Sequence, residues 1–392
     1  MAAVMRGALA VAMALAFVLP ALVRAQPDSS RAYAYQPDWP RIAKHMVDTS
    51  LQLAPGERVI IHYDPDRDPA LIAALRTEIV RAGAIISGEL TWPNEEMGKY
   101  LDALTPAQRR SRAEIEMATY RELFASSDVY LWIHASNYED LVPREFEHLI
   151  GDSKVRAIHS HWFEPDDTSE RDTARRMYER AIVADPAEMD ALLAPMEAHL
   201  RGSRVHLTSP AGTDLTFEIP ADAPFHRNTG AATREKAAAA RSVRDREEEL
   251  PAGVLRTTAV TNANGKLVAG VFDSAASDGV ALTFRNGRIV KVEPRGSAGE
   301  SFEKWYKTVT GDRDRISELV IGANPYLTPI LPSGFMPYYG YGAGIVRIAI
   351  GDNWESGGTL RTSDSADKWL FVTDGSLSAG SVPIVRNGAL IR

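Results

Sequence analysis

The stretch Arg58-Val-Ile-Ile-His-Tyr63, followed by Pro69 to Ala82 at helical spacing, decides the fold class of this chain. The first segment is a short apolar run typical of a buried strand, and the second has the periodicity of a helix that Gly83 ends. Ala84 to Leu90 has the pattern of a second strand. A strand, a helix and a strand in this order predict a mostly parallel sheet covered by helices on both faces.

The same alternation of strands and helices continues to about Gly202. Thr105 is an N-cap residue followed by Pro106 at the first helical position, which predicts a helix to about Phe124. Two more strands, each followed by a helix, are expected at 128–134 and 154–159. No glycine-rich phosphate loop follows the first strand, so the sequence does not predict a dinucleotide site.

After about Arg204 short strands and turns replace this alternation. The dipeptides Asn286-Gly287 and Asn387-Gly388 predict hairpins, because both residue types tolerate positive φ. An Ala/Arg/Glu-rich stretch, Thr229 to Glu249, is expected to be a solvated helical insertion. The predicted fold is therefore α/β, with an N-terminal parallel-sheet domain at 26–203 and a β-rich α+β domain at 204–392. Strands of the second domain are expected at 205–207, 215–219, 267–272 and 280–284.

The first 25 residues are expected to be a secretory signal peptide. A short basic region ends at Arg6, an apolar run covers 8–22, and Val23-Arg24-Ala25 places small residues at the cleavage positions. The run is too short to span a bilayer, so no membrane span is expected after its removal. The sequence therefore predicts an exported protein, periplasmic or secreted.

The chain is acidic and has no cysteine. Its formal net charge is −8, and removal of Arg6 and Arg24 with the signal segment would make it −10. Because phosphate backbones are bound by clustered positive charge, nucleic acid is not an expected partner. The absence of cysteine excludes disulfides, so stability must come from an ordinary hydrophobic core.

The stretch Glu318-Leu-Val-Ile-Gly-Ala-Asn-Pro325, with Arg347 in a later apolar strand, has the frame of a metallopeptidase active site. The last histidine of the chain is His226. A transition-metal site built from later residues would therefore depend on carboxylates alone.

Several segments of the chain, in order, resemble the aminopeptidase T family of AmpS/PepS-type thermophilic metalloaminopeptidases. They are Leu53-Ala-Pro-Gly-Glu57, Ala82-Gly-Ala84, Ala211-Gly-Thr-Asp-Leu215, Leu250-Pro-Ala-Gly253, 283–290 and 318–325. The resemblance covers nearly the whole chain after the signal segment. It implies two divalent metals (Zn, Co or Mn) held in the C-terminal domain by two glutamates, two histidines, an aspartate and a tyrosine, and a possible homodimer.

Matched position by position, this resemblance implies that one metal ligand is kept, as Glu318. The other five positions hold residues that do not bind metals in this way: Val254, Arg347, Trp354, Ala366 and Lys368. The assignment of Ala366 and Lys368 to the final His-x-Asp pair is open to slippage. No cofactor is therefore expected, and the catalytic residues stay unknown.

Two of the positions that the resemblance matches to metal ligands hold positively charged residues, Arg347 and Lys368. We expect Arg347 to form a charge-assisted pair with Glu318, because an unpaired buried carboxylate costs several kcal/mol; the alternative is that both point into solvent. Lys368 is a second candidate cation.

A glycine-rich run, Gly340 to Gly344, has Tyr338, Tyr339 and Tyr341 in it or beside it, and is either an aromatic loop over the cleft or a plain strand connection.

His159 and His161 would share one face of a strand, a spacing that metal sites use. Acids follow closely at Glu164, Asp166 and Asp167 and could add oxygen ligands. The alternative is a strand end that leads into an acidic helix start. With His134, these histidines are also the available candidates for a general base in the first domain.

Three functions are compatible with these residues. One is a pseudo-enzyme that binds a small molecule or peptide through Glu318, Arg347 and the three tyrosines, and another is a hydrolase with metal-independent chemistry. The alternative is an active metalloaminopeptidase with a rearranged metal site. The family scaffold is also similar to that of dihydroxypyridine ring-cleaving dioxygenases, whose iron needs a similar ligand set.

Overall fold

The structure is a computed structural model that describes residues 34–65, 67–92, 95–133, 148–165, 167–271 and 276–391. Residues Tyr33–Arg392 form one compact unit. The expected signal segment, His134 and Asp166 lie outside the described residues. Within the described ranges, none of the helices combines the length and the apolar character needed to cross a bilayer.

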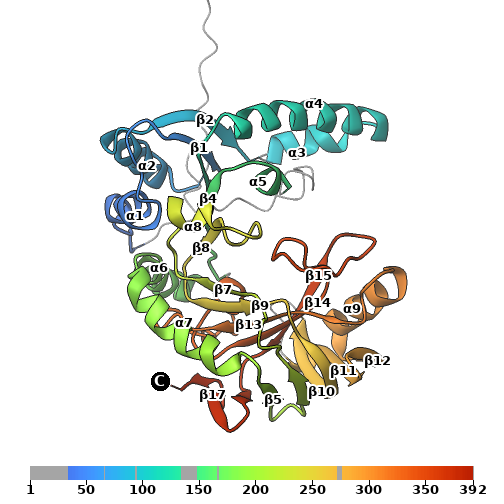
Figure 1. The fold of residues 1–392 in the computed structure, drawn as a ribbon. Helices are drawn as coiled ribbons and strands as arrows, with labels where there is room; N and C mark the ends of the chain where they lie inside the picture. The colour runs from blue at the N-terminus through green and yellow to red at the C-terminus, as the bar shows by residue number, and fades with distance from the viewer. Residues whose placement is uncertain are drawn as a thin grey trace, which may run out of the picture. The chain divides into compact units, whose positions relative to one another are not determined.

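Five strands of the described residues form a parallel sheet in the order β2-β1-β3-β4-β8 (Figure 1). The first strand is β1 (Arg58–Tyr63), as its apolar run predicts, and helix α2 (Pro69–Arg81) follows it. The chain turns after α2 at Gly83, whose φ of 77° lies in the left-handed region. The remaining strands are β2 (Ile85–Thr91), β3 (Val129–Ile133), β4 (Arg156–Ser160) and β8 (Glu247–Leu250).

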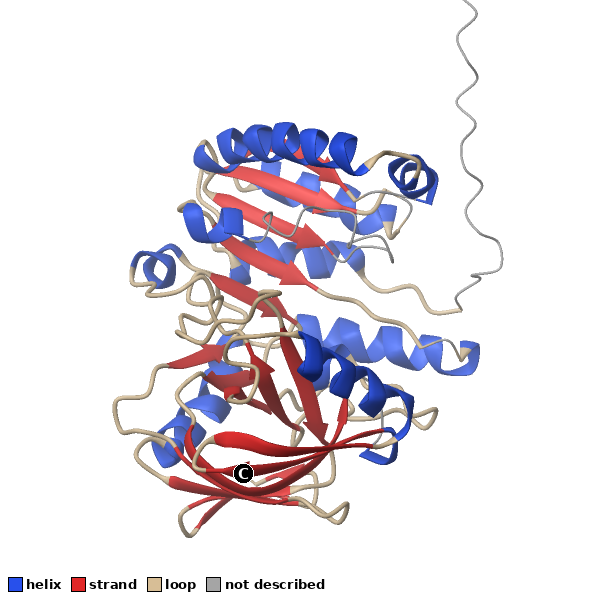
Figure 2. Ribbon diagram, turned by 90° about the vertical axis from the view of Figure 1, so that its right-hand side faces the viewer, coloured by secondary structure: helices blue, strands red, loops and turns tan. Residues whose placement is uncertain are grey.

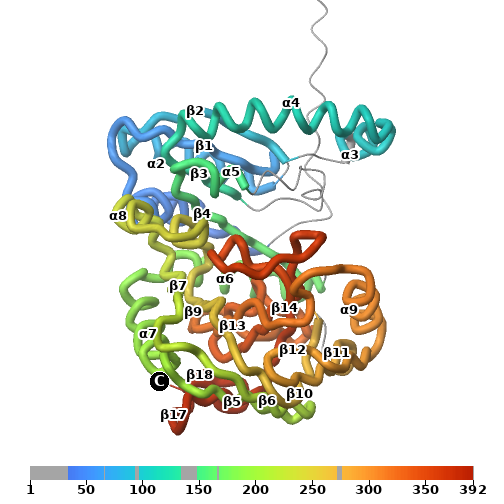
Figure 3. The backbone as a smooth tube through the Cα atoms, turned by 45° about the vertical axis from the view of Figure 1, so that its right-hand side comes forward, coloured from blue at the N-terminus to red at the C-terminus, as the bar shows by residue number. Residues whose placement is uncertain are grey.

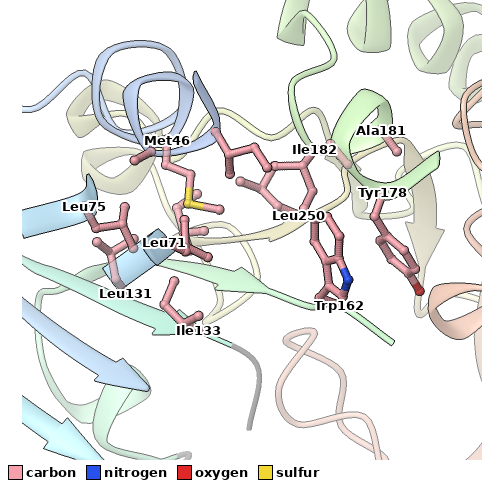
Figure 4. Packing of buried hydrophobic residues seen from close by; sticks show 14 of the residues in the cluster. Met46, Leu71, Leu75, Leu131, Ile133, Trp162, Tyr178, Ala181, Ile182 and Leu250 are labelled. Atoms are coloured by element: carbon pink, nitrogen blue, oxygen red, sulfur yellow. The ribbon is translucent and has the colours of Figure 1, made fainter. Parts of the chain in front are cut away.

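Helices cover both faces of this sheet because successive strand residues point to opposite sides. Val59 and Ile61 of β1 pack in a cluster with α1 (Trp39–His45), α2 and α6 (Thr168–Ile182), part of which Figure 4 shows. Ile60 packs instead with Met117 and Phe124 of α4 (Pro106–Ala125) and with α5 (His148–Asp152). A parallel sheet with helices on both faces confirms the predicted fold class of the N-terminal half.

The predicted helix after Thr105 is confirmed. The Thr105 side chain accepts from the backbone N–H of Gln108, and the Gln108 side chain accepts from the backbone N–H of Thr105, which completes a capping box. The other helices are α3 (Glu95–Asp102), α7 (Pro186–Leu200), α8 (Arg234–Ala238) and α9 (Gly296–Thr308).

The expected solvated helix over Thr229 to Glu249 is wrong. Only α8 is helical there, and the stretch ends in β8, which pairs with β4 and completes the parallel sheet. The side chains of Glu247, Glu248 and Glu249 are buried. Three consecutive glutamates favour an exposed helix by composition, and pairing with β4, together with ion pairs to Arg244 and Arg256, overrides that preference.

The C-terminal half forms an antiparallel sheet, which in the described residues has 13 strands (Figure 2). Both expected hairpins are confirmed: Asn286-Gly287 joins β11 to β12, and Asn387-Gly388 joins β17 to β18, all four residues having positive φ. The strands are β5 (Arg204–Thr208), β6 (Asp214–Glu218), β7 (Phe225–Asn228), β9 (Val254–Thr257), β10 (Thr261–Val271), β11 (Gly279–Arg285), β12 (Arg288–Pro294), β13 (Ile316–Gly322), β14 (Val346–Gly351), β15 (Asp367–Val372), β16 (Ser376–Ala379), β17 (Val382–Arg386) and β18 (Ala389–Leu390).

Strands β9, β13, β14 and β15 are consecutive neighbours in this sheet; Figure 3 labels β9, β13 and β14. One face is apolar: Leu319, Ile348 and Leu370 pack there with Phe302 and Trp305 of α9. The opposite face carries Glu318 and Arg347, both buried. Alternation along the strands therefore separates an apolar layer from a polar one, and the polar layer holds the candidate site.

Candidate functional site

The register of the central strands places one glutamate between two arginines. Val320 of β13 pairs with Arg256 of β9 on one side and with Arg347 of β14 on the other. Glu318 lies two residues before Val320 on the same face, so each arginine is its diagonal neighbour. The signature glutamate is thus flanked by two guanidinium groups, one of which the sequence did not single out.

Arg347 and Glu318 are both buried, with 2% and 7% of their side chains exposed, and Nη2 lies 3.8 Å from Oε2. This distance makes them an ion pair but is too long for the direct hydrogen bond that we expected. The other oxygen of Glu318 accepts instead from the hydroxyl of Ser356. The alternative that both residues point into solvent is wrong.

Arg256 supplies the second cation beside Glu318. Its Nε lies 3.9 Å from Oε2 of Glu318, and its Nη2 donates to the hydroxyl of Tyr341 at 2.6 Å and to Glu249 at 3.1 Å. The hydroxyl of Tyr341 donates to the same Glu249 carboxylate. The C-terminal sheet is therefore joined to β8 of the parallel sheet through buried, charge-assisted hydrogen bonds.

Arg244 extends this network along β8. Its Nη1 contacts Glu247 at 3.0 Å and Glu249 at 3.1 Å, and its Nη2 contacts Glu355 at 2.6 Å. Nδ1 of His159, on β4, lies 2.7 Å from Glu247. We call the three arginines and three glutamates at its centre the buried charge cluster: Arg244, Glu247, Glu249, Arg256, Glu318 and Arg347. Its formal charges balance.

The cluster shifts the titration of its members. Burial acts to raise the pKa of Glu249, but Arg244 and Arg256 outweigh it and hold that pKa well below its usual range. Burial raises the pKa of Tyr341. Burial, reinforced by the charge of Glu318, raises the pKa of Asp367 to about 6. Asp367 therefore titrates close to neutral pH, mainly because it is buried.

A cavity of about 100 Å³ opens beside this cluster. Arg244, Glu318 and Arg347 line it, together with Asp367 and Trp369 of β15 and with 352–355 and Ser365 of the loop between β14 and β15. The Arg347 guanidinium lies over the Trp369 ring at 4.2 Å, a cation–π contact. Since a water occupies about 30 Å³ of liquid, the cavity has room for a carboxylate head group or a few waters.

Arginine donors around the cavity are left without acceptors. Nε and Nη1 of Arg347 are buried and have no hydrogen-bond partner among the described residues; the same holds for Nε and Nη1 of Arg256, which lies beside Glu318 but does not line this cavity. A buried N–H group without a partner costs about 1–3 kcal/mol, more when it is charged. The site therefore has a surplus of donors that an oxyanion could satisfy.

The structure brings together three of the six positions that the resemblance matched to metal ligands. Glu318, Arg347 and Trp354 line the cavity. Val254 is fully buried and packs in the apolar cluster that contains Val320 and Leu250.

The other two matched positions do not face this cavity. Ala366 contributes its backbone carbonyl, which accepts from Thr362. Lys368 lies on the opposite face of β15, with Nζ 5.5 Å from the centre of the Trp305 ring. Strand alternation instead turns Asp367 and Trp369 toward the cavity. The expectation that Lys368 adds a cation to the site is therefore wrong.

The three tyrosines of the glycine-rich run form no open aromatic loop. Tyr338 and Tyr341 are fully buried, and Tyr338 stacks on His161 with ring centroids 4.7 Å apart. Tyr339 makes an edge contact with Trp369 at 4.8 Å. Of the three, Tyr341 is the residue whose hydroxyl joins the buried charge cluster.

The candidate metal site at His159 and His161 is not formed. His159 contacts Glu247, while Glu164 receives a hydrogen bond from Arg175 at 2.7 Å. Asp167 caps α6 by accepting from the backbone N–H of Ser169 at 2.8 Å. Burial and the neighbouring His159 lower the pKa of His161 to about 3, so that imidazole is neutral at physiological pH.

Sequence reasoning missed Arg244, Glu249 and Arg256. The sequence signal that could have found Arg256 is its position two residues after Val254, on the same face of a strand. No comparable signal marked Arg244 or Glu249: they lie five residues apart, but the partners that tie them to the site, Glu355 and Tyr341, are distant in the chain.

These residues do not fit the dinuclear metal centre that the resemblance implies. Guanidinium groups flank the one retained carboxylate, and a cation cannot ligate a metal. Among the described residues, no group of three or more His, Cys, Asp or Glu side chains is placed to hold a metal ion.

Two solved structures share the fold. Wild-type AmpT from Thermus thermophilus matches with a TM-score of 0.66 and 16% identity, over 90% of this chain and 99% of that chain. The 2,5-dihydroxypyridine dioxygenase from Pseudomonas putida KT2440 matches with a TM-score of 0.60 and 15% identity, over 90% and 96%. No family model and no curated protein matches the sequence. The chain therefore has an aminopeptidase-like fold, and its chemistry depends on its own residues.

Proposed function

We propose that this protein is an aminopeptidase-like pseudo-enzyme that binds a small zwitterion, an amino acid or a short peptide, without a metal. The observation that carries the proposal is Arg347. Its guanidinium is 2% exposed, lines the cavity and has two N–H groups without an acceptor among the described residues. A carboxylate would satisfy such donors in pairs, because guanidinium and carboxylate groups match in a planar, two-point geometry.

The charge of the site favours a zwitterion over a simple anion. The buried charge cluster is formally neutral, but the cavity wall also carries Asp352, Glu355 and Asp367, so a simple anion would face an excess of carboxyl groups. Asp367, with a pKa of about 6, is ionised at pH 7 and lies on the same cavity wall. A ligand ammonium group could face Asp367 and Glu318 while its carboxylate contacts Arg347.

The binding test uses the purified full chain, dialysed against a chelator. Isothermal titration with leucine, glycine and Leu-Gly should show binding that Arg347→Lys weakens about tenfold or more. Lysine keeps the charge but lacks the planar guanidinium that can donate two hydrogen bonds to one carboxylate. Lys307→Gln, an exposed change on α9, is the control and should leave affinity unchanged. Absence of binding by all three ligands would refute the proposal.

A second measurement separates this function from the alternatives. Hydrolysis of aminoacyl-arylamides is followed with the chelated protein and after addition of zinc or cobalt. The proposal expects no turnover in either condition. Turnover abolished by chelator would identify a metalloaminopeptidase with a rearranged site, and turnover insensitive to chelator would identify a metal-independent hydrolase.

A further inference from the structure

A second and larger cavity, of about 740 Å³, lies where the first residues of the parallel strands meet the 234–246 segment. Glu57 and Asp128 immediately precede β1 and β3, and Arg156 opens β4. Trp354 belongs to the wall of this cavity and also to that of the smaller one. A volume of this size is in the range of small-molecule sites.

The lining of this cavity is basic although the protein is acidic. Five cations line it and only two carboxylates do, Glu57 and Asp128, in a chain whose net charge is −8. The five cations are Lys154, Arg156, Arg234, Arg241 and Arg246. Asp128 is already engaged by Arg58, which does not line the cavity. The excess positive charge is therefore local and is not cancelled at the wall.

Arg156 is a buried cation of the cavity wall. Its side chain is 2% exposed, and its Nη2 donates to both oxygens of Glu57 at 2.8 Å. Nε and Nη1 are buried and have no hydrogen-bond partner among the described residues. Because Arg234 contacts the same Glu57 at 3.0 Å, one carboxylate serves two guanidinium groups. Arg156 thus keeps two charged donors for another acceptor.

Arg246 contributes charge and has no carboxylate partner in the part of the chain that the structure describes. Its Nη groups donate to backbone carbonyls of α5 and the residues after it: Ile150 at 2.7 Å, Gly151 at 3.0 Å and Ser153. These neutral acceptors fix the guanidinium in place and leave its charge uncompensated. Lys154 and Arg241 are exposed residues of the same wall, and Arg241 lies 3.5 Å from Asp245.

We infer that this cavity is a binding site for a small, multiply charged oxyanion, a phosphate group or a polycarboxylate. Arg156 would hold the anion through its unsatisfied donors, and Lys154 and Arg241 would attract it from the rim. The site differs from the smaller cavity in chemistry: it has a surplus of cations, whereas the buried charge cluster is balanced.

The test is isothermal titration of the full chain with inorganic phosphate and with citrate, in chloride buffers of matched ionic strength. The double variant Lys154→Gln, Arg241→Gln should weaken binding about tenfold, because two exposed charges are lost at short range. A matched control is Lys304→Gln together with Lys307→Gln, which removes two charges from α9; this pair should change affinity less than about twofold.

Arg156→Lys keeps the charge but removes the planar guanidinium with its several N–H donors, and should weaken binding by about a further order of magnitude. The melting temperature of Arg156→Lys is measured alongside. If this variant fails to fold, the double variant Lys154→Gln, Arg241→Gln still tests the inference. Tighter phosphate binding would identify a phosphate ligand, and tighter citrate binding a polycarboxylate. Absence of binding by both at about 10 mM, or equal weakening in the α9 control, would overturn the inference.

Discussion

Replacing Glu318 by Gln tests whether the signature glutamate serves two arginines or a metal. Glutamine has nearly the same volume and can still accept from Ser356. The change therefore removes the negative charge with little effect on packing. If Glu318 is the arginines' partner, the variant leaves Arg347 and Arg256 buried with less compensation.

The distances set the magnitude. Each guanidinium nitrogen lies 3.8–3.9 Å from the carboxylate, which corresponds to about 4 kcal/mol per pair at an effective dielectric constant of about 20. Relief of the Glu318 desolvation and of its repulsion with Asp367 offsets much of this. Measured losses on breaking buried pairs are about 3–5 kcal/mol, so we expect a loss of about 3 kcal/mol. For a chain of this length that is roughly 4 °C in Tm.

The assay is thermal unfolding in the presence of chelator and again with added zinc. We expect the same loss for Glu318→Gln in both conditions. The pair is confirmed by a double-mutant cycle, in which Arg347→Met costs less when combined with Glu318→Gln than it does in the wild type. Glu303→Gln, a surface change within an i,i+4 pair on α9, is the control and should cost less than about 0.5 kcal/mol.

Two outcomes would refute the interpretation of Glu318. An unchanged Tm in Glu318→Gln would show that the arginines do not depend on its charge. A loss seen only with zinc present would show that its partner is a metal.

Three further predictions concern the cluster and the sheet. Tyr341→Phe removes the hydroxyl that bridges a buried glutamate and a buried arginine and should cost about 1–3 kcal/mol in urea unfolding; a loss below about 0.5 kcal/mol contradicts that bridge. The pKa of Asp367 in the folded protein is about 6, above the ordinary value of 3.8. As pH rises, the Asp367 carboxyl therefore ionises at lower pH in the unfolded chain than in the folded protein, and the free energy of unfolding falls between about pH 4 and 6. Asp367→Asn should therefore raise Tm at pH 7.5 and have little effect at pH 4, and an equal shift at both pH values contradicts this. Gly299→Ala should destabilise by more than about 2 kcal/mol, because its Cβ would lie 1.8 Å from the carbonyl oxygen of Gly279, whereas Ser297→Ala in the same helix should be nearly neutral.

Local signals were enough for most of the fold. The strand at Arg58–Tyr63, the capped helix after Thr105 and the hairpin at Asn286-Gly287 all depend on neighbouring residues, and the structure has all three. The segment predicted wrongly was 229–249, where composition favours a helix. Its last residues form a strand because they complete a sheet edge built from residues much earlier in the chain.

The candidate site was predicted only in part, for the same reason. Glu318 and Arg347 could be related through one signature and one strand pattern. Arg256 and Arg244 could not, because their roles depend on which strands become neighbours. Lys368 was misplaced by a single position along its strand, and one position reverses the face to which a side chain points.

The sequence by itself determined the alternation of strands and helices and the hairpins. These properties depend on residue type and short spacing. Only the tertiary structure decided that three glutamates of β8 are buried and that three arginines from separate segments balance the cluster's carboxylates. Charges in water are screened and tolerate many arrangements, whereas buried charges must each find a partner, and the partners of Glu318, which are Arg256 and Arg347, come from other strands than its own.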